Sequence, residues 1–381
     1  MVNCITRRQQ VLKDINEIGK LVIGSNAKSV DQEKQFPHIS MAALREKELQ
    51  TLAIPVRFGG MGAGLQEDIL LLPLALMKIA NWCSSTSQVF ALHQSAVQHI
   101  KIYGDENQKK FFFEEIKKGH YFGSFGAEGR IKSTLRRVDK GYILNGEKIF
   151  TTGSLGATWA IWRVSSQDDI ENRTYLPIIN LHAKGITVLD TWDGIGQRGT
   201  GSGKVVAKNV FISEEHVMMV EEEKATTILF ASMFHINFSA QFIGIAQAAL
   251  KEAIRYIQEI PLKKESDLVR LRIGELSAKT KAAEQLMLYA ARQLQAFEDG
   301  QVTVESLQLS AAQTKIISTD TVLDVTNTIF QVMGARSATT AYNFDRFYRN
   351  ARTLTLHDEV DRQRIIAGTL EIKTYGLEDI R

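Results

Sequence analysis

The chain has 381 residues, of which 44% are hydrophobic and 23% charged, and its formal net charge is +3. These values are typical of a globular protein large enough for two or three structural units. Because the charge is small and no basic run interleaves with aromatic residues, we expect no nucleic-acid partner. The two cysteines, Cys4 and Cys83, are too few for a disulfide framework or a Cys-based metal site, which fits a reducing cytoplasm.

No apolar run approaches the ~20 residues that a membrane span needs. The N-terminal residues 1–8 lead into charged amphipathic sequence rather than a signal-peptide core. We therefore expect a cytoplasmic protein that has neither a membrane partner nor a metal.

The first third of the chain has the patterns of helices. Val11, Ile15, Ile18 and Val22 follow the spacing of an apolar helical stripe. Residues 68–80 and 86–103 are also rich in apolar residues and helix formers, and a glycine-rich loop at 54–64 precedes them. No strand precedes that loop and no Gly-Lys-Ser/Thr follows it, so a structural loop is favoured over a phosphate cradle. We predict a helical domain over residues 1–120.

The middle of the chain has the patterns of strands. Asn145-Gly146 stands between alternating apolar residues, which is a hairpin signal. Residues 157–164, 174–181 and 203–212 are further predicted strands. Regular strands with Gly and Asn turns and no intervening helix indicate a small antiparallel β-barrel over residues 121–217.

The last third returns to helical patterns, and no proline follows Pro261. One apolar stripe runs through residues 242–257, and a second alternates by four and three from Val269 to Phe297. These stripes predict a helical bundle of four helices over residues 218–381. The predicted fold class is α+β, mainly α.

Four local motifs, in this order of domains, carry a family resemblance. They are the segments Ile54–Gly64, Tyr103–Lys110, Gly146–Gly153 and Gln331–Ala335. With the helical, barrel and bundle order, they resemble the acyl-CoA dehydrogenase superfamily of flavoproteins. The resemblance implies that family's fold and a flavin cofactor, FMN or FAD.

Other segments depart from the dehydrogenases and point to one branch of the superfamily. Residues 127–133 replace the family's "TEPxxGSD" motif, and residues 261–269 lack an arginine that binds the adenosine half of FAD. Residues 150–159, 192–202 and 345–358 instead resemble the flavin-dependent monooxygenases of this fold, such as dibenzothiophene and sulfone monooxygenases. The loss of the arginine that binds the adenosine half of FAD, with a phosphate-binding arginine kept, suits FMN at least as well as FAD.

Several residues are candidates for the flavin site. Phe150 and Thr152 alternate on a predicted strand and so share one face, and the resemblance places Phe150 beside the flavin ring and the Thr152 hydroxyl at its N5 edge. The resemblance also implies a phosphate-binding role for Arg336, assisted by Arg349. Trp192 is either a wall of the site or a packing anchor. The full set of cofactor-binding candidates is Phe150, Thr152, Gly153, Trp192, Gln331, Gly334, Arg336 and Arg349.

The catalytic candidates are His357 and Asp358. A neutral imidazole can accept and donate a proton, and a neighbouring carboxylate makes proton transfer plausible. His93 is a further histidine that could face the pocket. In the monooxygenase branch, His357 would manage protons during oxygen activation on a small S-, N- or C-centred substrate, with a separate flavin reductase as partner. In the alternative, an acyl-CoA dehydrogenase, Asp358 holds the position of the base. The resemblance also implies a homotetramer or homodimer.

Overall fold

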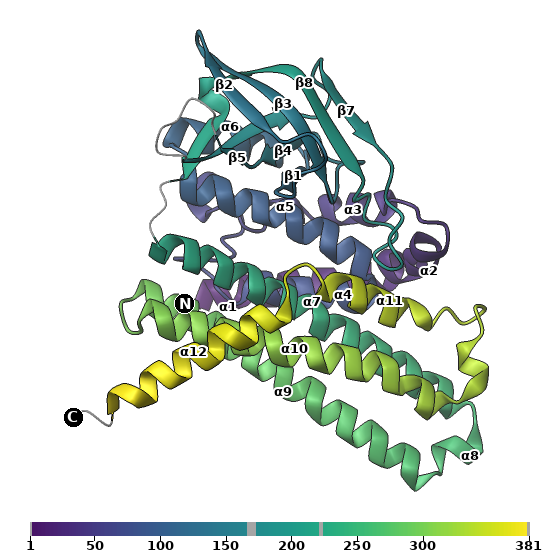
Figure 1. The fold of residues 1–381 in the computed structure, drawn as a ribbon. Coiled ribbons are helices and arrows are strands. Elements are labelled where there is room, and N and C mark those ends of the chain that lie inside the picture. Colours follow the sequence, from purple (N-terminus) through teal and green to yellow (C-terminus); the bar gives the residue numbers. More distant parts are fainter. Residues whose placement is uncertain (1, 166–172, 221–223, 379–381) are drawn as a thin grey trace.

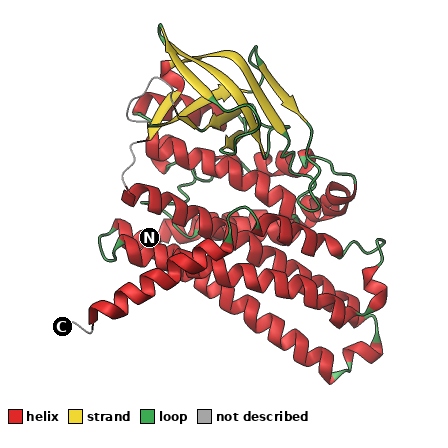
Figure 2. Ribbon diagram, in the orientation of Figure 1, coloured by secondary structure: helices red, strands yellow, loops and turns green. Residues whose placement is uncertain are grey.

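The computed structural model describes residues 2–165, 173–220 and 224–378. The strands gather at one end of the molecule, the N-terminal helices form a middle layer, and long C-terminal helices form the other end (Figures 1 and 2). The predicted fold class, α+β and mainly α with the acyl-CoA dehydrogenase-like order, is confirmed.

The N-terminal helices enclose a core shared with the bundle. Val11, Ile15 and Ile18 are buried as the predicted stripe requires, but a π-helical turn, η1 (Gly19–Ile23), then interrupts the periodicity. Because a π-turn adds one residue, Ile23 is buried in place of Val22. The helices are α1 (Val2–Ile18), α2 (Gly24–Gln32), α3 (His38–Glu46), α4 (Leu71–Trp82), α5 (Ser84–Tyr103) and α6 (Glu106–Lys117).

The strands form two sheets that pack face to face around their own core. One sheet has the order β1-β4-β6-β5, with β9 also paired to β6, and the other has the order β2-β3-β8-β7. The described strand pairs are antiparallel, as predicted, except for the parallel pair β1–β4. The strands are β1 (Phe122–Phe125), β2 (Thr134–Val138), β3 (Gly141–Ile149), β4 (Trp159–Trp162), β5 (Val164–Ser165), β6 (Thr174–Asn180), β7 (Ile186–Leu189), β8 (Lys204–Ser213) and β9 (Val217–Val220).

The hairpin predicted at Asn145-Gly146 is wrong. β3 continues through both residues, and its pairing with β8 shifts register between Leu144 and Gly146 as a β-bulge. The chain reverses earlier, at Lys140, whose φ is +57°. The same two residues that favour a tight turn also favour a bulge, because Gly146 has a φ of +144°.

The C-terminal helices form a bundle in which both predicted stripes pack inward. Phe242, Ala246, Ala249, Ala253 and Ile257 are all buried on α7. α7 is long and apolar enough to cross a membrane by composition, but 61% of its apolar window is buried, as in the core helix of a bundle. The helices are α7 (Lys224–Gln258), α8 (Pro261–Lys264), α9 (Asp267–Glu298), α10 (Val304–Met333), α11 (Asp345–Thr355) and α12 (Val360–Glu378).

The bulge in β3 gives a test of the sheet. A Cβ at position 146 would lie 2.6 Å from the Ser133 Cα, so Gly146→Ala should lower the free energy of unfolding by about 2 kcal/mol or more. Gly274, on α9, has no atom within 4 Å of its added Cβ, so Gly274→Ala should stabilise by about 0.5–1 kcal/mol. Urea unfolding of both variants measures the difference. Equal free energies of unfolding for the two variants would contradict the requirement for glycine in the bulge.

Candidate active site

The loop after β3 presents an aromatic side chain to solvent. β3 ends at Ile149, and Phe150 has a left-handed backbone with φ of +54° and 61% of its surface exposed. Thr152 is buried, so the prediction that the two side chains share one face of a strand is wrong. The Phe150 ring meets the Trp192 ring edge to face, with 6.1 Å between centroids. The structure therefore brings together two of the residues predicted for the cofactor.

A row of hydroxyl groups lies beneath this loop. The Thr152 Oγ1 is 2.7 Å from the Ser202 Oγ, which is 2.6 Å from the Thr200 Oγ1. The Gly153 amide donates to the Thr200 carbonyl at 2.9 Å, and Gly153 has a φ of +86°. These bonds fix the two loops 150–154 and 197–203 against each other.

The Trp192 loop is tied to the helices by Gln197. The Trp192 Nε1 donates to the Gln197 carbonyl at 2.8 Å. The Gln197 backbone amide donates to the Asn350 Oδ1 at 2.6 Å, and its side-chain amide donates to Ser84. Gln197 thus connects the strand region to both α5 and α11.

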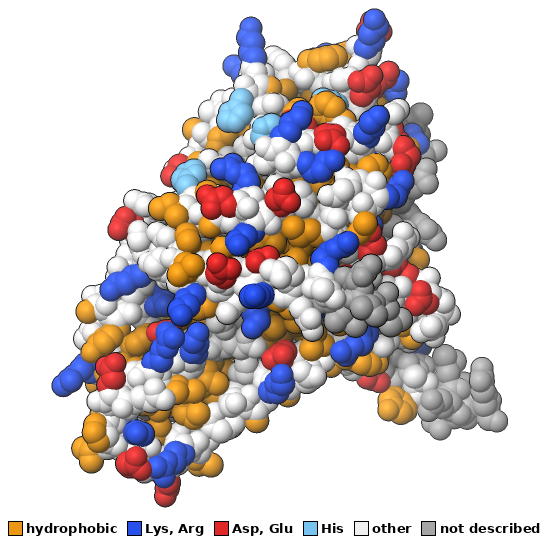
Figure 3. All heavy atoms as spheres, turned by 180° about the vertical axis from the view of Figure 1, so that it is seen from behind, with side chains coloured by type: hydrophobic (Ala, Val, Ile, Leu, Met, Phe, Trp, Pro, Cys, Tyr) orange, Lys and Arg blue, Asp and Glu red, His pale blue; other side chains and the backbone are white. Residues whose placement is uncertain are grey.

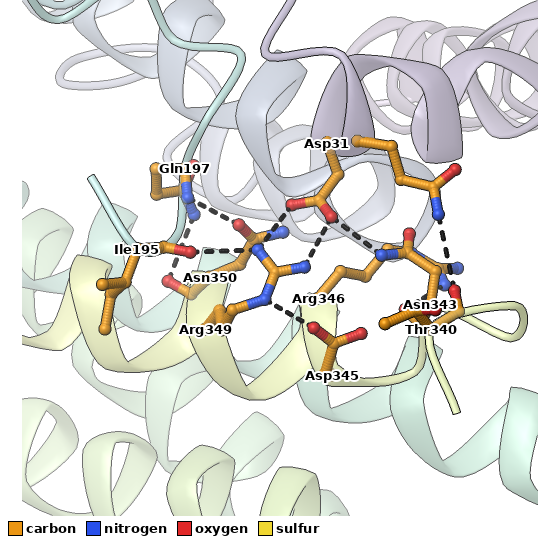
Figure 4. Close-up of polar contacts among 10 residues, drawn as sticks. Asp31, Ile195, Gln197, Thr340, Asn343, Asp345, Arg346, Arg349 and Asn350 are labelled. Atoms are coloured by element: carbon orange, nitrogen blue, oxygen red, sulfur yellow. Dashed lines mark hydrogen bonds and ion pairs between the residues drawn. The ribbon is translucent and has the colours of Figure 1, made fainter. Parts of the chain in front are cut away.

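Arg349 lies at the centre of a network that joins three parts of the chain (Figure 4). Its guanidinium donates to both carboxylate oxygens of Asp31 at 2.9 and 2.6 Å, to Asp345 at 2.7 Å and to the Ile195 carbonyl at 3.0 Å. Asp31 is 3% exposed and also accepts a bond from Asn343 at 2.9 Å. The predicted phosphate-assisting role of Arg349 stays a prediction, but its donors are already engaged within the chain.

The His357 imidazole packs against aromatic rings of α7. Its centroid is 4.5 Å from that of Phe238 and 5.1 Å from that of Phe234. Although part of the residue faces solvent, removal of the charged ring from water lowers the pKa of His357 to about 4, and the nearby Lys315 charge adds to this effect. The ring is therefore neutral at pH 7.

Asp358 is paired rather than free. Its Oδ2 accepts from the His235 Nε2 at 2.9 Å and from the Gln363 Nε2 at 2.8 Å. The hydrogen bond from His235 is the main reason that the pKa of Asp358 lies below its ordinary value, and burial opposes it. A carboxylate with a lowered pKa is a weaker base.

The predicted residues Gln331, Gly334 and Arg336 lie elsewhere, at the C-terminal end of α10. Gln331 and Arg336 are exposed, and Gly334 has a φ of +85° that suits the end of the helix. The Lys263 Nζ donates to the Val332 carbonyl at 3.0 Å, so a second cation is held beside this turn.

Two residues near His357 are missing from the candidates derived from the sequence. His235 is one, and Lys315, a buried lysine of α10, is the other. Lys315 could have been noticed as a lone charge within an otherwise apolar and small-residue helix face. His93, in contrast, is a core residue, because its ring nitrogens bond the Gln50 carbonyl at 2.8 Å and the Phe122 amide at 3.0 Å.

Family models match most of the chain. They are the acyl-CoA dehydrogenase N-terminal domain at residues 7–120, the middle domain at 126–210 and the C-terminal domain at 236–362. The chain therefore belongs to the acyl-CoA dehydrogenase superfamily and is a flavin-dependent oxidoreductase.

Several relatives of the chain are monooxygenases, and others are an acryloyl-CoA reductase of Anaerotignum propionicum and a probable acyl-CoA dehydrogenase of Bacillus subtilis. Dibenzothiophene monooxygenase of Rhodococcus erythropolis is 27% identical over 350 residues, covering 83% of this chain and 82% of that protein. A probable FMNH2-dependent monooxygenase of Pseudomonas putida is 27% identical and covers 85% of both chains. The FMN-bound structure of TdsC from Paenibacillus sp. A11-2 has a TM-score of 0.87 at 25% identity, covering 96% of this chain and 98% of that one.

Two features at the end of β3 are consistent with a flavin site. Phe150 combines a left-handed backbone with a largely exposed aromatic ring, which is an unusual arrangement unless a flat apolar surface covers it. The neighbouring hydroxyl row supplies hydrogen-bond partners of the kind that a flavin's polar edge needs.

The Arg349–Asp31 pair gives a test of the network. Arg349→Met leaves the buried Asp31 carboxylate without its cation, so the free energy of unfolding should fall by about 3 kcal/mol. Arg364→Met breaks the exposed Arg364–Asp320 pair and should cost less than about 1 kcal/mol. Urea unfolding measures both losses, and equal losses would show that the network does not stabilise the fold.

The same pair should make stability depend on pH. Although burial opposes it, the hydrogen bonds from Arg349 and Asn343 lower the pKa of Asp31 below its ordinary value of 3.8. The stabilisation is therefore complete above that value and is lost as the pH falls through the lower folded-state pKa. Relative to Asp31→Asn, the wild-type advantage should persist at pH 6 and disappear in strong acid.

Proposed function

We propose that the protein is the oxygenase component of a two-component, FMN-dependent monooxygenase. The observation that carries the proposal is His357, a neutral imidazole packed against two aromatic rings of α7 and directly before Asp358, the position where the dehydrogenases of the family have a carboxylate base. The 27% identity to an FMNH2-dependent monooxygenase over most of the chain supports it. A separate reductase supplies the reduced flavin.

The residues have separate tasks in this proposal. The flavin, when bound, supplies the electrons that activate O2. Phe150 and Trp192 cover the ring, and Thr152 presents a hydroxyl held in place by Ser202. The neutral His357 brings no charge of its own to the site, and its ring nitrogens would accept a proton from, or donate a hydrogen bond to, a reacting group. Phe234 and Phe238 pack against one part of its ring.

The alternative, an acyl-CoA dehydrogenase, has less support. Its base would be Asp358, whose Oδ2 is bonded to both His235 and Gln363. Because these bonds favour the ionised form, they reduce the driving force for removing a carbon-bound proton.

Arg336 supports a phosphate site shared between subunits. Lys315 and Met333, the last residue of α10, are 18 residues apart, which is about 27 Å at about 1.5 Å per residue, and Arg336 lies three residues beyond Met333. His357 lies near Lys315, so one flavin cannot reach both His357 and Arg336 of the same chain. An FMN phosphate bound by Arg336 would therefore belong to the site of a neighbouring subunit.

His357→Ala gives the test of function. The enzyme with FMN, NADH, a flavin reductase and ¹⁸O2 is given dibenzothiophene, indole or methanesulfinate, and labelled product is measured by mass spectrometry. The variant should lose at least about 100-fold in oxygen incorporation while binding FMN within twofold of wild type. His182→Ala, at an exposed position on the strand region, should keep full activity.

The pH dependence follows from the same residue. Because the pKa of His357 is lowered to about 4, wild-type turnover should not fall between pH 8 and pH 6 from protonation of this ring. Anaerobic bleaching of the bound flavin by butyryl-CoA, without oxygen incorporation into any of the three substrates, would support the dehydrogenase instead.

We also infer a homo-oligomer, a homotetramer or homodimer, built through the bundle. Leu268 and Leu271 on α9 and Ile372 and Tyr375 on α12 are each more than 60% exposed. Hydrophobic side chains gather on the surface at the end of the bundle where α8 joins α9 (Figures 1 and 3), and a groove of about 410 Å³ runs between α7 and α9. Exposed apolar area of this kind marks a protein interface.

Charged substitutions test the interface. The double variant Leu271→Asp, Ile372→Asp should reduce the mass measured by sedimentation to that of a smaller assembly, and it should weaken FMN binding if Arg336 acts across the interface. Ile131→Asp, on the strand region, is the control for exposed apolar residues. An unchanged mass for the double variant would exclude this face.

A further inference from the structure

Lys315 is a fully buried lysine whose ammonium has no hydrogen-bond partner among the described residues. Its ammonium group carries three N–H donors, and burying it without a partner costs several kcal/mol. The other fully buried lysine, Lys148, shows the usual solution: its Nζ lies 2.5 Å from the Glu128 carboxylate. Lys315 therefore lacks the partner that a buried lysine requires.

Two aromatic rings stabilise the Lys315 charge in part. The Lys315 Nζ lies 5.5 Å from the centroid of Phe238 and 4.7 Å from that of Phe242. Such contacts favour the charge by about 0.5–2 kcal/mol, but they leave the N–H donors unused. The Oγ1 of Thr319, one helical turn further along α10, is also buried without a partner.

The neighbouring ionisable groups compensate this positive charge only in part. They are His235 on α7 and His357 and Asp358 in the turn between α11 and α12. The only carboxylate among them, Asp358, bonds His235 and Gln363. Burial lowers the pKa of Lys315 to about 8, with Asp358 acting in the opposite direction, so the ammonium form dominates at pH 7.

Lys315 and His357 contact the same ring. The Phe238 centroid is 5.5 Å from the Lys315 Nζ and 4.5 Å from the His357 centroid. The partly exposed His357 and the buried Lys315 ammonium thus contact the same phenyl ring, and a second group of a molecule bound at His357 would have to occupy the position next to the Lys315 Nζ. A water molecule at that position would satisfy a donor, but it would leave the charge unbalanced.

We propose that Lys315 binds an anionic group of the substrate, a carboxylate or a sulfur oxyanion, and that the enzyme therefore acts on a small organic anion. This inference rests on the proposed function, which places the substrate beside His357. The apolar wall of Phe234, Phe238 and Phe242 would hold the remainder of the molecule, and the Lys315 charge would select against its neutral analogues.

The test compares matched ligands on the FMN-loaded protein by calorimetry. Benzoate and benzenesulfonate carry the two anionic groups, and benzamide is the neutral analogue of benzoate. At pH 7 at least one anion should bind 10-fold or more tightly than benzamide, and the better anion identifies the group. Lys315→Met should remove that preference, and Lys315→Arg should retain part of it.

Two controls keep the result interpretable. Lys279→Met, at an exposed position on α9, should leave the preference intact. In the wild-type protein, anion binding should weaken at least 10-fold between pH 7 and pH 9.5 as Lys315 loses its proton, and benzamide binding should not change. This pH measurement needs no variant, so it decides the question even if Lys315→Met does not fold.

Equal affinities for anions and benzamide, or a preference that survives Lys315→Met, would overturn the inference. Its failure is separable from that of the proposed function. Oxygen incorporation into dibenzothiophene or indole without anion preference would support the monooxygenase and exclude the anion site. Anion binding that depends on Lys315, in a protein that only dehydrogenates acyl-CoA, would support the anion site and exclude the monooxygenase.

Discussion

The arrangement of the candidate site depends on one ion pair, between Arg349 of α11 and Asp31 of α2. The pair is largely buried, so the carboxylate and the guanidinium must stay together. Through the Ile195 carbonyl and the neighbouring Gln197–Asn350 bond, the same segment holds the loop that carries Trp192. Three distant parts of the chain thus meet at α11. This helix ends at Thr355, and the chain then leads directly into His357 and Asp358.

The electrostatics around His357 follow from its position after that helix. Asp358 is compensated by His235, and the imidazole is kept neutral by the aromatic rings and by Lys315. A site of this kind holds a base and an unpaired cation a single phenyl ring apart. In the proposed function, proton transfer at His357 and recognition of an anionic group at Lys315 would be separate tasks, which a single carboxylate base does not provide.

The sequence predicted what depends on local periodicity. The order of helical, strand and helical parts follows from apolar spacing, as do the stripes of α7 and α9, and the family motifs brought His357 and the Phe150 loop into view. Long-range partners were not predictable. Asp31 precedes Arg349 by 318 residues, and nothing in either local sequence indicates the other. Asn145-Gly146 has the composition of a turn, but pairing with β2 and β8 on both sides forces it to be a bulge.

The conformation of Phe150 has a consequence for how this loop can vary. A left-handed backbone is one that glycine adopts most easily, and a large side chain there is unfavourable for folding alone. Because its ring is largely exposed, Phe150 also contributes little hydrophobic stabilisation to the chain without a ligand. Folding stability and retention of an aromatic surface therefore make opposite demands on this position, and a chain that no longer bound a flat ligand would be free to lose the ring.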